Sequence, residues 1–205
     1  MRVAVVGGTG SFGKAVAKRL VDAGIEVVIG SRDPERARAA AEPIGAEGAG
    51  NDDAVRGADL VLFAVKADAA VESAAELRQS IGSTPVFSVC AELSFGPGGV
   101  KPTGEATSIA RRIQDELDAP VAAGLHSLAA SNLADAPPEE DAFVCGDDEV
   151  AKQLALDLAA RLVSGRAVDC GPLASARALE GMTAVIVNVN KRYKAHAGLR
   201  LTGLS

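Results

Sequence analysis

Residues 3–13 read VAVVGGTGSFG, and this stretch decides the fold of the chain. Four β-prone apolar residues lead directly into glycines, and a segment compatible with a helix follows. The pattern G-x-G-x-x-G is present there, formed by Gly8, Thr9, Gly10, Ser11, Phe12 and Gly13. Such glycines allow a tight strand-to-helix turn whose backbone N–H groups approach a pyrophosphate, with the positive end of the helix dipole facing it. The stretch therefore predicts dinucleotide binding, and a turn with a purely structural role is the alternative.

The second strand indicates which dinucleotide is bound. Residues 25–30 form an apolar run, and Ser31 and Arg32 follow where NAD-binding chains have an acidic residue for the ribose hydroxyls. Arg36 comes about one helical turn later, and guanidinium groups bind phosphate in a bidentate manner. Asp33 is acidic, but we expect it to cap the helix that begins at Pro34. The sequence predicts NADP rather than NAD; the alternative is that both arginines are solvated surface charges.

The composition fits a parallel α/β core. The chain has 205 residues, of which 48% are hydrophobic and only 3% aromatic, so Ala, Val, Leu and Ile must fill the interior. The net charge of −6 gives no indication of a nucleic-acid or anionic membrane partner. No signal-peptide pattern precedes the first strand and no apolar run reaches membrane-spanning length, so we expect a cytoplasmic protein.

The cysteines give no indication of a disulfide framework or a metal site. Cys90, Cys145 and Cys170 are odd in number, far apart and without a C-x-x-C pattern. We expect all three to be reduced residues of a core, and we expect no metal ion to be bound.

Strand and helix patterns alternate along the chain. Further strands are predicted at residues 25–30, 60–65, 85–89, 121–123, 142–145 and 167–169, with a short edge strand within 45–50. Alternation of this kind implies right-handed crossovers, so we predict a Rossmann-type, doubly wound, mostly parallel sheet. We divide it into an NADP-binding domain (1–125) and a small C-terminal α/β lobe (126–205) that ends in a long helix.

Two segments interrupt the regular alternation. Residues 91–107 are rich in Gly and Pro, and we expect a long, helix-free loop at the carboxyl edge of the sheet, functional rather than disordered. The last helix has one apolar face, formed by Leu179, Met182, Val185, Ile186 and Val189. This face is larger than a small lobe requires, so we predict a homodimer that pairs through it.

Motifs along nearly the whole chain resemble the NADPH-dependent oxidoreductases of the 8-hydroxy-5-deazaflavin coenzyme F420. The family's G-G-T-G-x-x-G and G-S-R motifs are matched at residues 7–13 and 30–32. Its C-G-D-D and D-x-G-P-L motifs are matched at 145–148 and 169–173, and residues 189–198 look like the C-terminus of bacterial members. The N-terminal motifs are shared with many NADP enzymes, whereas the C-terminal ones are more specific.

The chain departs from the family pattern at two pocket walls. Members often have a proline-containing S-P-L-x-P where this chain reads SVCAEL at residues 88–93. They also commonly carry a proline shortly after the histidine that is matched by His126. The resemblance therefore describes the NADP side of the site better than the deazaflavin side.

The resemblance implies hydride transfer between NADP(H) and coenzyme F420 by direct stacking of the nicotinamide and deazaflavin rings. This chemistry needs positioning rather than acids and bases. It places the nicotinamide near Val65, Lys66 and Ser88. It places the deazaflavin against Val89, Cys90, His126, Ser127 and Leu128, and the coenzyme's anionic tail against Lys191, Arg192 and Lys194.

Each of these roles has an alternative. His126 either hydrogen-bonds to the deazaflavin ring or is a core histidine; Cys90 is a pocket wall or a core residue. Lys66 is a nicotinamide neighbour or a surface lysine, and the basic end of the last helix contacts the tail or complements the helix dipole.

Two other functions remain open from the sequence. One is an NADPH-dependent reductase of a small imine or oxo acid, although only 80 residues follow Leu125, which leaves little room for the helical domain of those enzymes. The other is a non-catalytic NADP-sensing regulator. The sequence leaves the physiological direction of hydride transfer undetermined.

Overall fold

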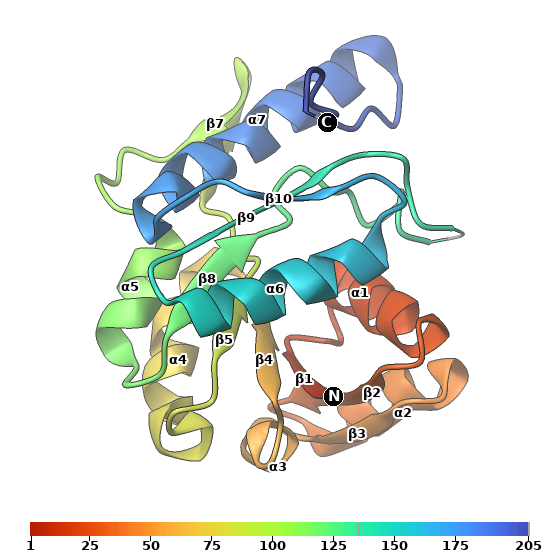
Figure 1. The fold of residues 1–205 in the computed structure, drawn as a ribbon, viewed down its shortest axis with the longest axis vertical. Coiled ribbons are helices and arrows are strands. Elements are labelled where there is room, and N and C mark those ends of the chain that lie inside the picture. Colours follow the sequence, from red (N-terminus) through yellow and green to blue (C-terminus); the bar gives the residue numbers. More distant parts are fainter. Residues whose placement is uncertain (135, 205) are drawn as a thin grey trace.

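The first strand, β1 (Arg2–Val6), lies inside an eight-stranded sheet, between β2 (Glu26–Ser31) and β4 (Leu60–Phe63) (Figure 1). The structure is a computed structural model and describes residues 1–134 and 136–204. The strand order is β10-β9-β8-β5-β4-β1-β2-β3. The remaining strands of this sheet are β3 (Glu47–Gly50), β5 (Val86–Ser88), β8 (Val121–Gly124), β9 (Ala142–Gly146) and β10 (Ala167–Asp169).

Neighbouring strands of this sheet pair in parallel except β8 and β9, which are antiparallel. The predicted doubly wound, mostly parallel fold is therefore confirmed, and so is the short strand β3 at the edge. A two-residue period along β1 sends alternate side chains to opposite faces of the sheet. Val3 and Val5 face one buried cluster, and Ala4 and Val6 face the other.

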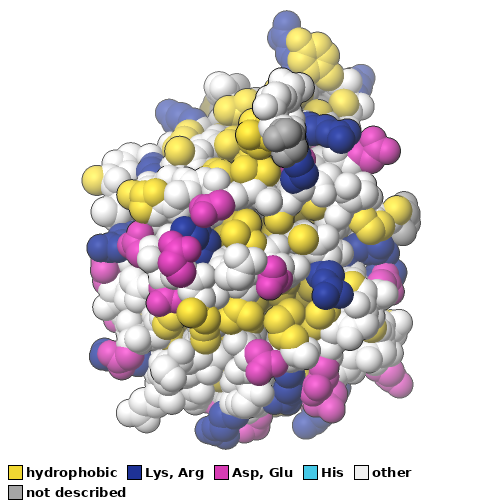
Figure 2. Space-filling view, viewed as in Figure 1, with side chains coloured by type: hydrophobic (Ala, Val, Ile, Leu, Met, Phe, Trp, Pro, Cys, Tyr) yellow, Lys and Arg dark blue, Asp and Glu magenta, His cyan; other side chains and the backbone are white. Residues whose placement is uncertain are grey.

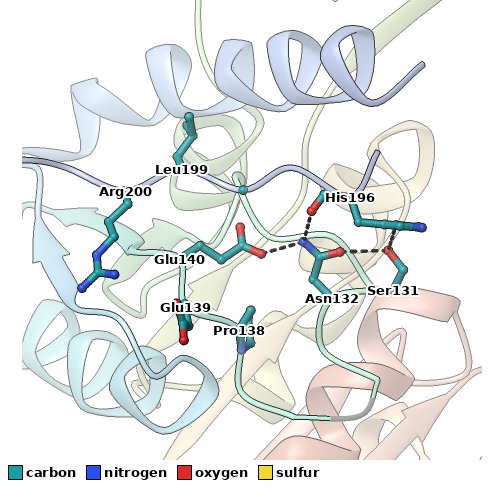
Figure 3. Close-up of a pocket in the computed structure, with 9 residues that line it drawn as sticks. Ser131, Asn132, Pro138, Glu139, Glu140, His196, Leu199 and Arg200 are labelled. Atoms are coloured by element: carbon teal, nitrogen blue, oxygen red, sulfur yellow. Dashed lines mark hydrogen bonds between the residues drawn. The ribbon is translucent and has the colours of Figure 1, made fainter. Parts of the chain in front are cut away.

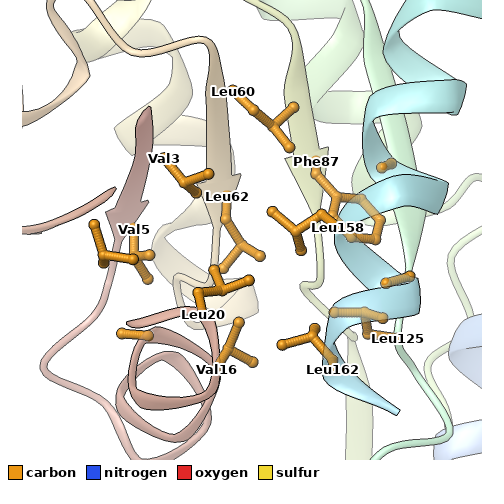
Figure 4. Packing of buried hydrophobic residues seen from close by; sticks show 14 of the residues in the cluster. Val3, Val5, Val16, Leu20, Leu60, Leu62, Phe87, Leu125, Leu158 and Leu162 are labelled. Atoms are coloured by element: carbon orange, nitrogen blue, oxygen red, sulfur yellow. The ribbon is translucent and has the colours of Figure 1, made fainter. Parts of the chain in front are cut away.

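Helices cover both faces. The helices are α1 (Ser11–Asp22), α2 (Pro34–Ala41), α3 (Asn51–Val55), α4 (Ala67–Ile81), α5 (Ile109–Glu116), α6 (Glu149–Leu162) and α7 (Ala176–Tyr193). Figure 4 shows α1 and α6 packing Leu20 and Leu158 against one face of the sheet, where Phe87 supplies the largest buried ring. The opposite face is covered by α4 and α5, and α7 lies beyond the upper ends of the strands in Figure 1.

Both segments on either side of residue 125 belong to this one sheet. β9 and β10 extend it beyond β8, and one buried cluster contains Val3 of the first segment and Leu158 of the second. The division into domains at residues 1–125 and 126–205 stays a prediction.

Residues 91–107 are free of helix, as predicted, but they contain a hairpin that the sequence did not indicate. β6 (Leu93–Gly96) and β7 (Gly99–Pro102) pair antiparallel. A two-stranded hairpin is marginal in isolation. Here α7 supports it, because the Asn188 side chain donates to the Val100 carbonyl (2.6 Å) and accepts from the Val100 amide (2.8 Å). This support comes from a residue 88 positions away, so local sequence gives no sign of it.

Among the helices of the described residues, none has the length and apolarity needed to cross a membrane. The described residues also contain no group of three or more His, Cys, Asp or Glu side chains that could hold a metal ion. Cys90 and Cys145 are buried, Cys170 is half-buried, and all three are free thiols.

Candidate functional site

The glycines of the first turn are required for different structural reasons. Gly7 has φ +82°, and a Cβ there would lie 2.5 Å from the Ala64 carbonyl oxygen. A Cβ on Gly13 would lie 2.7 Å from the Gly7 carbonyl oxygen, so this glycine lets α1 approach the turn closely. Gly10 is the N-cap of α1 in extended conformation, and a Cβ there would meet only the Gly7 carbonyl oxygen, at 3.3 Å. The fold therefore requires Gly7 and Gly13, whereas Gly10 leaves the helix N-terminus accessible to an anion.

A cavity of about 490 Å³ lies beside this turn, at the carboxyl ends of β1, β2 and β4. Its lining residues are Val6, Gly7, Thr9, Gly10, Ser31, Arg32, Asp33, Arg36, Asn51, Ala64, Val65, Lys66, Asp68, Ala69 and Ser73. Open α/β sheets bind ligands at this edge. The cavity unites the glycine turn with the Ser31–Arg32 segment, as the sequence predicts.

Asp33 is occupied by the backbone of α2. Its Oδ1 accepts from the amides of Glu35 (3.0 Å) and Arg36 (3.4 Å), which confirms the predicted cap. Arg32 and Arg36 are exposed at the cavity, and neither forms an ion pair within the described residues. Two unpaired guanidinium groups therefore line one end of the cavity.

Asn51 is a cavity residue that sequence reasoning missed. Gly50 is the N-cap of α3, and Asn51 lies at the first helical position. Its Oδ1 is buried without a hydrogen-bond partner in the described structure. A Cβ on Gly30 would lie 2.9 Å from this atom, so Gly30 makes room for the Asn51 side chain. A polar residue directly after an edge strand, at the carboxyl edge, is the signal that could have identified it.

A second cavity of about 230 Å³ continues the first. It is lined by Gly10, Ser11, Phe12, Gly13, Ala64, Val65, Lys66, Ala67, Val89, Cys90 and Ala91. Gly10, Ala64, Val65 and Lys66 line both cavities, so the two lie next to each other, and we call them together the cleft. The cleft runs from the arginines, past the glycine turn, to a wall formed by residues 89–91.

His126 lies behind this wall rather than in the cleft. The side chain is 5% exposed, and its Nε2 is 3.0 Å from the Cys90 carbonyl oxygen. Burial lowers the pKa of His126 to about 4, so the ring is neutral near pH 7. Burial also raises the pKa of Cys90 to about 12, and its thiol donates to the Phe63 carbonyl oxygen.

Other predicted site residues lie outside both cavities. Gly8, Ser88, Ser127 and Leu128 are buried. The exposed cations at the C-terminal end of α7 are Lys191, Arg192 and Lys194. Lys191 Nζ lies 6.0 Å from the centre of the Phe95 ring on the hairpin.

A separate cavity of about 660 Å³ shares no lining residue with the cleft (Figure 3); it is lined by Ser131, Asn132, Pro138, Glu139, Glu140, His196, Gly198, Leu199 and Arg200. Glu140 Oε1 accepts from Asn132 Nδ2 (2.7 Å), and Ser131 Oγ lies 3.2 Å from His196 Nδ1. Burial raises the pKa of Glu140. The Ser131–His196 contact attaches the C-terminal segment to the loop before β9, whereas the Asn132–Glu140 bond lies within that loop.

The comparisons with known proteins agree with this geometry. The family model described as "NADP oxidoreductase coenzyme F420-dependent" matches residues 2–92. The F420-dependent NADP reductase of Methanothermobacter thermautotrophicus is 34% identical over 222 residues, which cover 100% of this chain and 96% of that protein. The protein of the same name from Methanocaldococcus jannaschii is 31% identical, covering 100% of this chain and 99% of that protein.

Solved structures give the same result. A putative F420-dependent NADP reductase from Arthrobacter superposes with a TM-score of 0.84 at 26% identity, covering 98% of this chain and 99% of that chain. An imine reductase from Streptomyces aurantiacus shares the fold alone, with a TM-score of 0.63 at 20% identity; 95% of this chain covers only 62% of that longer chain. The predicted resemblance is confirmed: the chain belongs to the family of the F420-dependent NADP reductases.

Proposed function

We propose that this protein is an oxidoreductase that transfers a hydride between NADP(H) and coenzyme F420. One observation carries the proposal: the two cavities share four lining residues and together reach from the arginines to residues 89–91. NADP has a ribose phosphate at its adenosine end, a pyrophosphate in the middle and its reactive nicotinamide ring at the other end. The cleft follows the same order: the arginines lie at one end, the glycine turn in the middle and the wall of residues 89–91 at the other end.

The residues of the cleft fit NADP. Gly10 exposes the N-terminus of α1 to the pyrophosphate, and the ribose phosphate can accept bonds from Arg32 and Arg36, which have no acidic partner in the described structure. Asn51 adds a polar side chain with an unpartnered buried oxygen. Buried polar atoms are rarely left without a partner, so this one marks a place for a ligand donor or a water.

The chain's own residues bind the two coenzymes and orient their rings. Bound NADPH and F420 supply the hydride donor and acceptor, which we propose stack directly on each other. Val65, Val89 and Ala91 give the second cavity apolar walls that exclude water from the transfer. The Cys90 thiol stays protonated because of its raised pKa, so it takes no part as a base. The hydride step itself needs no acid or base from these walls, and the one proton that completes the reduced deazaflavin comes from solvent.

Mixing the purified protein with NADPH and oxidised F420, and following both absorbances, tests the proposal. We expect equimolar consumption of the two. A regulator would bind NADPH without any exchange, and an imine or oxo-acid reductase would consume NADPH only with such a substrate; either result overturns the proposal. Direct stacking has its own test, because deuterium placed on the nicotinamide should appear in the deazaflavin and not in water.

The proposal also includes a position for the coenzyme's anionic tail and a homodimeric assembly. We infer that the coenzyme's anionic tail extends towards Lys191, Arg192 and Lys194. We also infer a homodimer through the outer face of α7, where Val185 is 57% exposed and Tyr193 is 73% exposed. Figure 2 shows hydrophobic side chains exposed in the upper part of the molecule, where Figure 1 places α7.

A further inference from the structure

The wall of the second cavity has no secondary structure of its own. β5 ends at Ser88, and residues 89–92 belong to neither a helix nor a strand. Two bonds hold the wall to the end of β4: the Val89 amide and the Cys90 thiol both donate to the Phe63 carbonyl oxygen, at 3.0 and 3.3 Å. Neither bond fixes the carbonyl side of Cys90, which is the side that continues into Ala91.

His126 provides an attachment at the Cys90 carbonyl itself, whereas the next anchored residue, Glu92, is held two positions further on by Arg112 (2.7 Å) and by the Thr103 hydroxyl (2.8 Å). A carbonyl oxygen only accepts, and a neutral imidazole carries one proton, so the proton must lie on Nε2 to form the 3.0 Å bond with Cys90. The opposite nitrogen, Nδ1, is then an acceptor, and it is buried without a partner in the described structure. A buried acceptor without a partner lowers stability, and an apolar side chain at this position would avoid that loss. The imidazole is therefore better explained by the bond at Nε2 than by core packing.

The backbone of His126 is itself held from two other elements. Leu125, the preceding residue, adopts φ +63°, an uncommon conformation for a residue with a branched side chain, and its amide donates to the Phe143 carbonyl oxygen of β9 (3.1 Å). Thr183 of α7 donates from its hydroxyl to the His126 carbonyl oxygen (2.7 Å). His126 and its neighbour Leu125 thus connect the cavity wall to β9 and α7.

We propose that His126 is a positioning residue for the hydride step. It lines neither cavity, so it acts through Cys90: its Nε2–H fixes residues 89–91, and these hold the nicotinamide ring at transfer distance. The inference rests on the proposed function, because the ring that the wall positions is that of NADP. It replaces the sequence-based expectation of direct contact between His126 and the deazaflavin.

Two substitutions separate positioning from packing. H126L removes the donor and keeps an apolar side chain; H126Q keeps an N–H donor at nearly the same reach. We expect H126L to lower the single-turnover rate of hydride transfer about ten- to a hundredfold, since a small misplacement of reacting atoms has effects of that size. The Kd for NADPH should change by less than about threefold, because the phosphate contacts lie in the other cavity. H126Q should recover most of the rate.

The fluorescence of bound NADPH gives a readout that needs no turnover. We expect its emission to shift in H126L and to return towards the wild-type spectrum in H126Q. Thr183→Val, which weakens the same attachment from α7, should lower the rate in the same direction and serves if H126L does not fold. An unchanged rate and spectrum in H126L overturns the inference, and so does an H126Q variant as slow as H126L. If wild-type protein binds NADPH and reduces no F420, the proposed function fails, while the emission shift still decides the role of His126.

Discussion

Single residues of the cleft differ in whether the fold or the ligand requires them. Gly7 and Gly13 have backbone neighbours closer than 3 Å to any added Cβ, so the protein itself excludes side chains there. Gly10 meets only one carbonyl oxygen, at 3.3 Å. Likewise the Asp33 side chain accepts hydrogen bonds from the backbone of α2, whereas Arg32 and Arg36 form no ion pair with a carboxylate of the described residues. Substitutions at Gly10 and Arg32 therefore test ligand binding with little effect on the fold.

Gly10→Val should abolish NADPH binding while the protein keeps a cooperative thermal unfolding transition. The added side chain occupies the space that the pyrophosphate needs at the N-terminus of α1. NADPH titration by fluorescence, together with the melting temperature, checks this. Gly13→Val is the matched control, because its clash with the turn should lower the melting temperature directly. Wild-type affinity in Gly10→Val would show that the phosphates bind elsewhere.

Arg32→Ala should raise the Michaelis constant for NADPH about ten- to a hundredfold and that for NADH little. Losing a charge-assisted contact to the ribose phosphate costs roughly 1.5–3 kcal/mol, and NADH lacks that phosphate. Steady-state kinetics with both cofactors measure the difference. Arg38→Ala is the control, since Arg38 lies on α2, directly after the Ser31–Arg32 segment, but pairs with Glu35 and lines neither cavity of the cleft. Equal weakening for both cofactors would contradict the assignment.

At the scale of elements, one buried carboxyl group joins three parts of the structure. Glu180 of α7 is fully buried, and its Oε1 accepts from the amide of Ile109 at the start of α5 (2.7 Å). Its Oε2 lies 3.3 Å from Arg177, and Arg177 donates to the Thr103 carbonyl oxygen after β7. Burial raises the pKa of Glu180 to about 7, and the charge of nearby Glu92 acts in the same direction.

Glu180→Gln should remove part of the pH dependence of stability. The pKa of Glu180 is higher in the folded state than its ordinary value of 4.5, so the native state binds the proton more tightly. The free energy of unfolding therefore falls as pH rises from about 4.5 to about 7, by an amount on the order of 3 kcal/mol. Urea unfolding of wild type and Glu180→Gln across this range measures the contribution.

Comparing the two proteins also separates Glu180 from His126, which titrates in an overlapping range with the opposite sign. The lowered pKa of His126 contributes stability above about 6.5 that is lost as pH falls towards 4. Both proteins contain His126, so its contribution cancels in the difference. A difference that does not vary with pH would show that Glu180 has no raised pKa in solution.

The basic end of α7 gives a second prediction at this scale. Neutralising Lys191 and Arg192 together with Gln should weaken binding of full-length F420, and rising salt should reduce the effect. A deazaflavin without the anionic tail should bind equally well to both proteins, because these cations contact only the tail. Michaelis constants for the two substrates at low and high salt are the measurement. Equal losses for both substrates would mean that the basic end has a structural role.

At the scale of the whole molecule, the exposed apolar residues concentrate on α7 and its neighbours. Leu179 and Ile186 of the predicted face are buried within the chain, at 4% and 6% exposure. Val185 remains 57% exposed, and Phe95 of the supported hairpin is 68% exposed. The apolar face of α7 is thus shared between the chain's own core and a surface that a second copy can cover.

Light scattering at micromolar concentration should give twice the chain mass of 20.7 kDa. Val185→Glu should shift this mass towards the monomer, because it places a charge in the proposed interface without disturbing the core. Val150→Glu is the control: Val150 is 66% exposed, but it lies on α6. A monomer mass for the wild-type protein would exclude the dimer.

The sequence by itself determined the features that short segments encode. The glycine turn at residues 7–13, the Ser31–Arg32 segment and the Asp33 cap depend on neighbours within a few residues, so their residue types reveal them. The parallel sheet follows from the alternation of apolar runs, because each buried strand needs apolar side chains wherever it lies. The resemblance that identifies the family rests on the same local motifs.

Only the tertiary structure decided the rest of the site. The hairpin depends on Asn188, which lies 88 residues away, and the wall of the second cavity depends on His126, which lies 36 residues from Cys90. The position of Asn51 in the cleft requires β2 and β3 to be paired. Such contacts join single polar atoms across long stretches of chain and leave no periodic pattern, because each needs only one donor and one acceptor brought together by the packing of other residues.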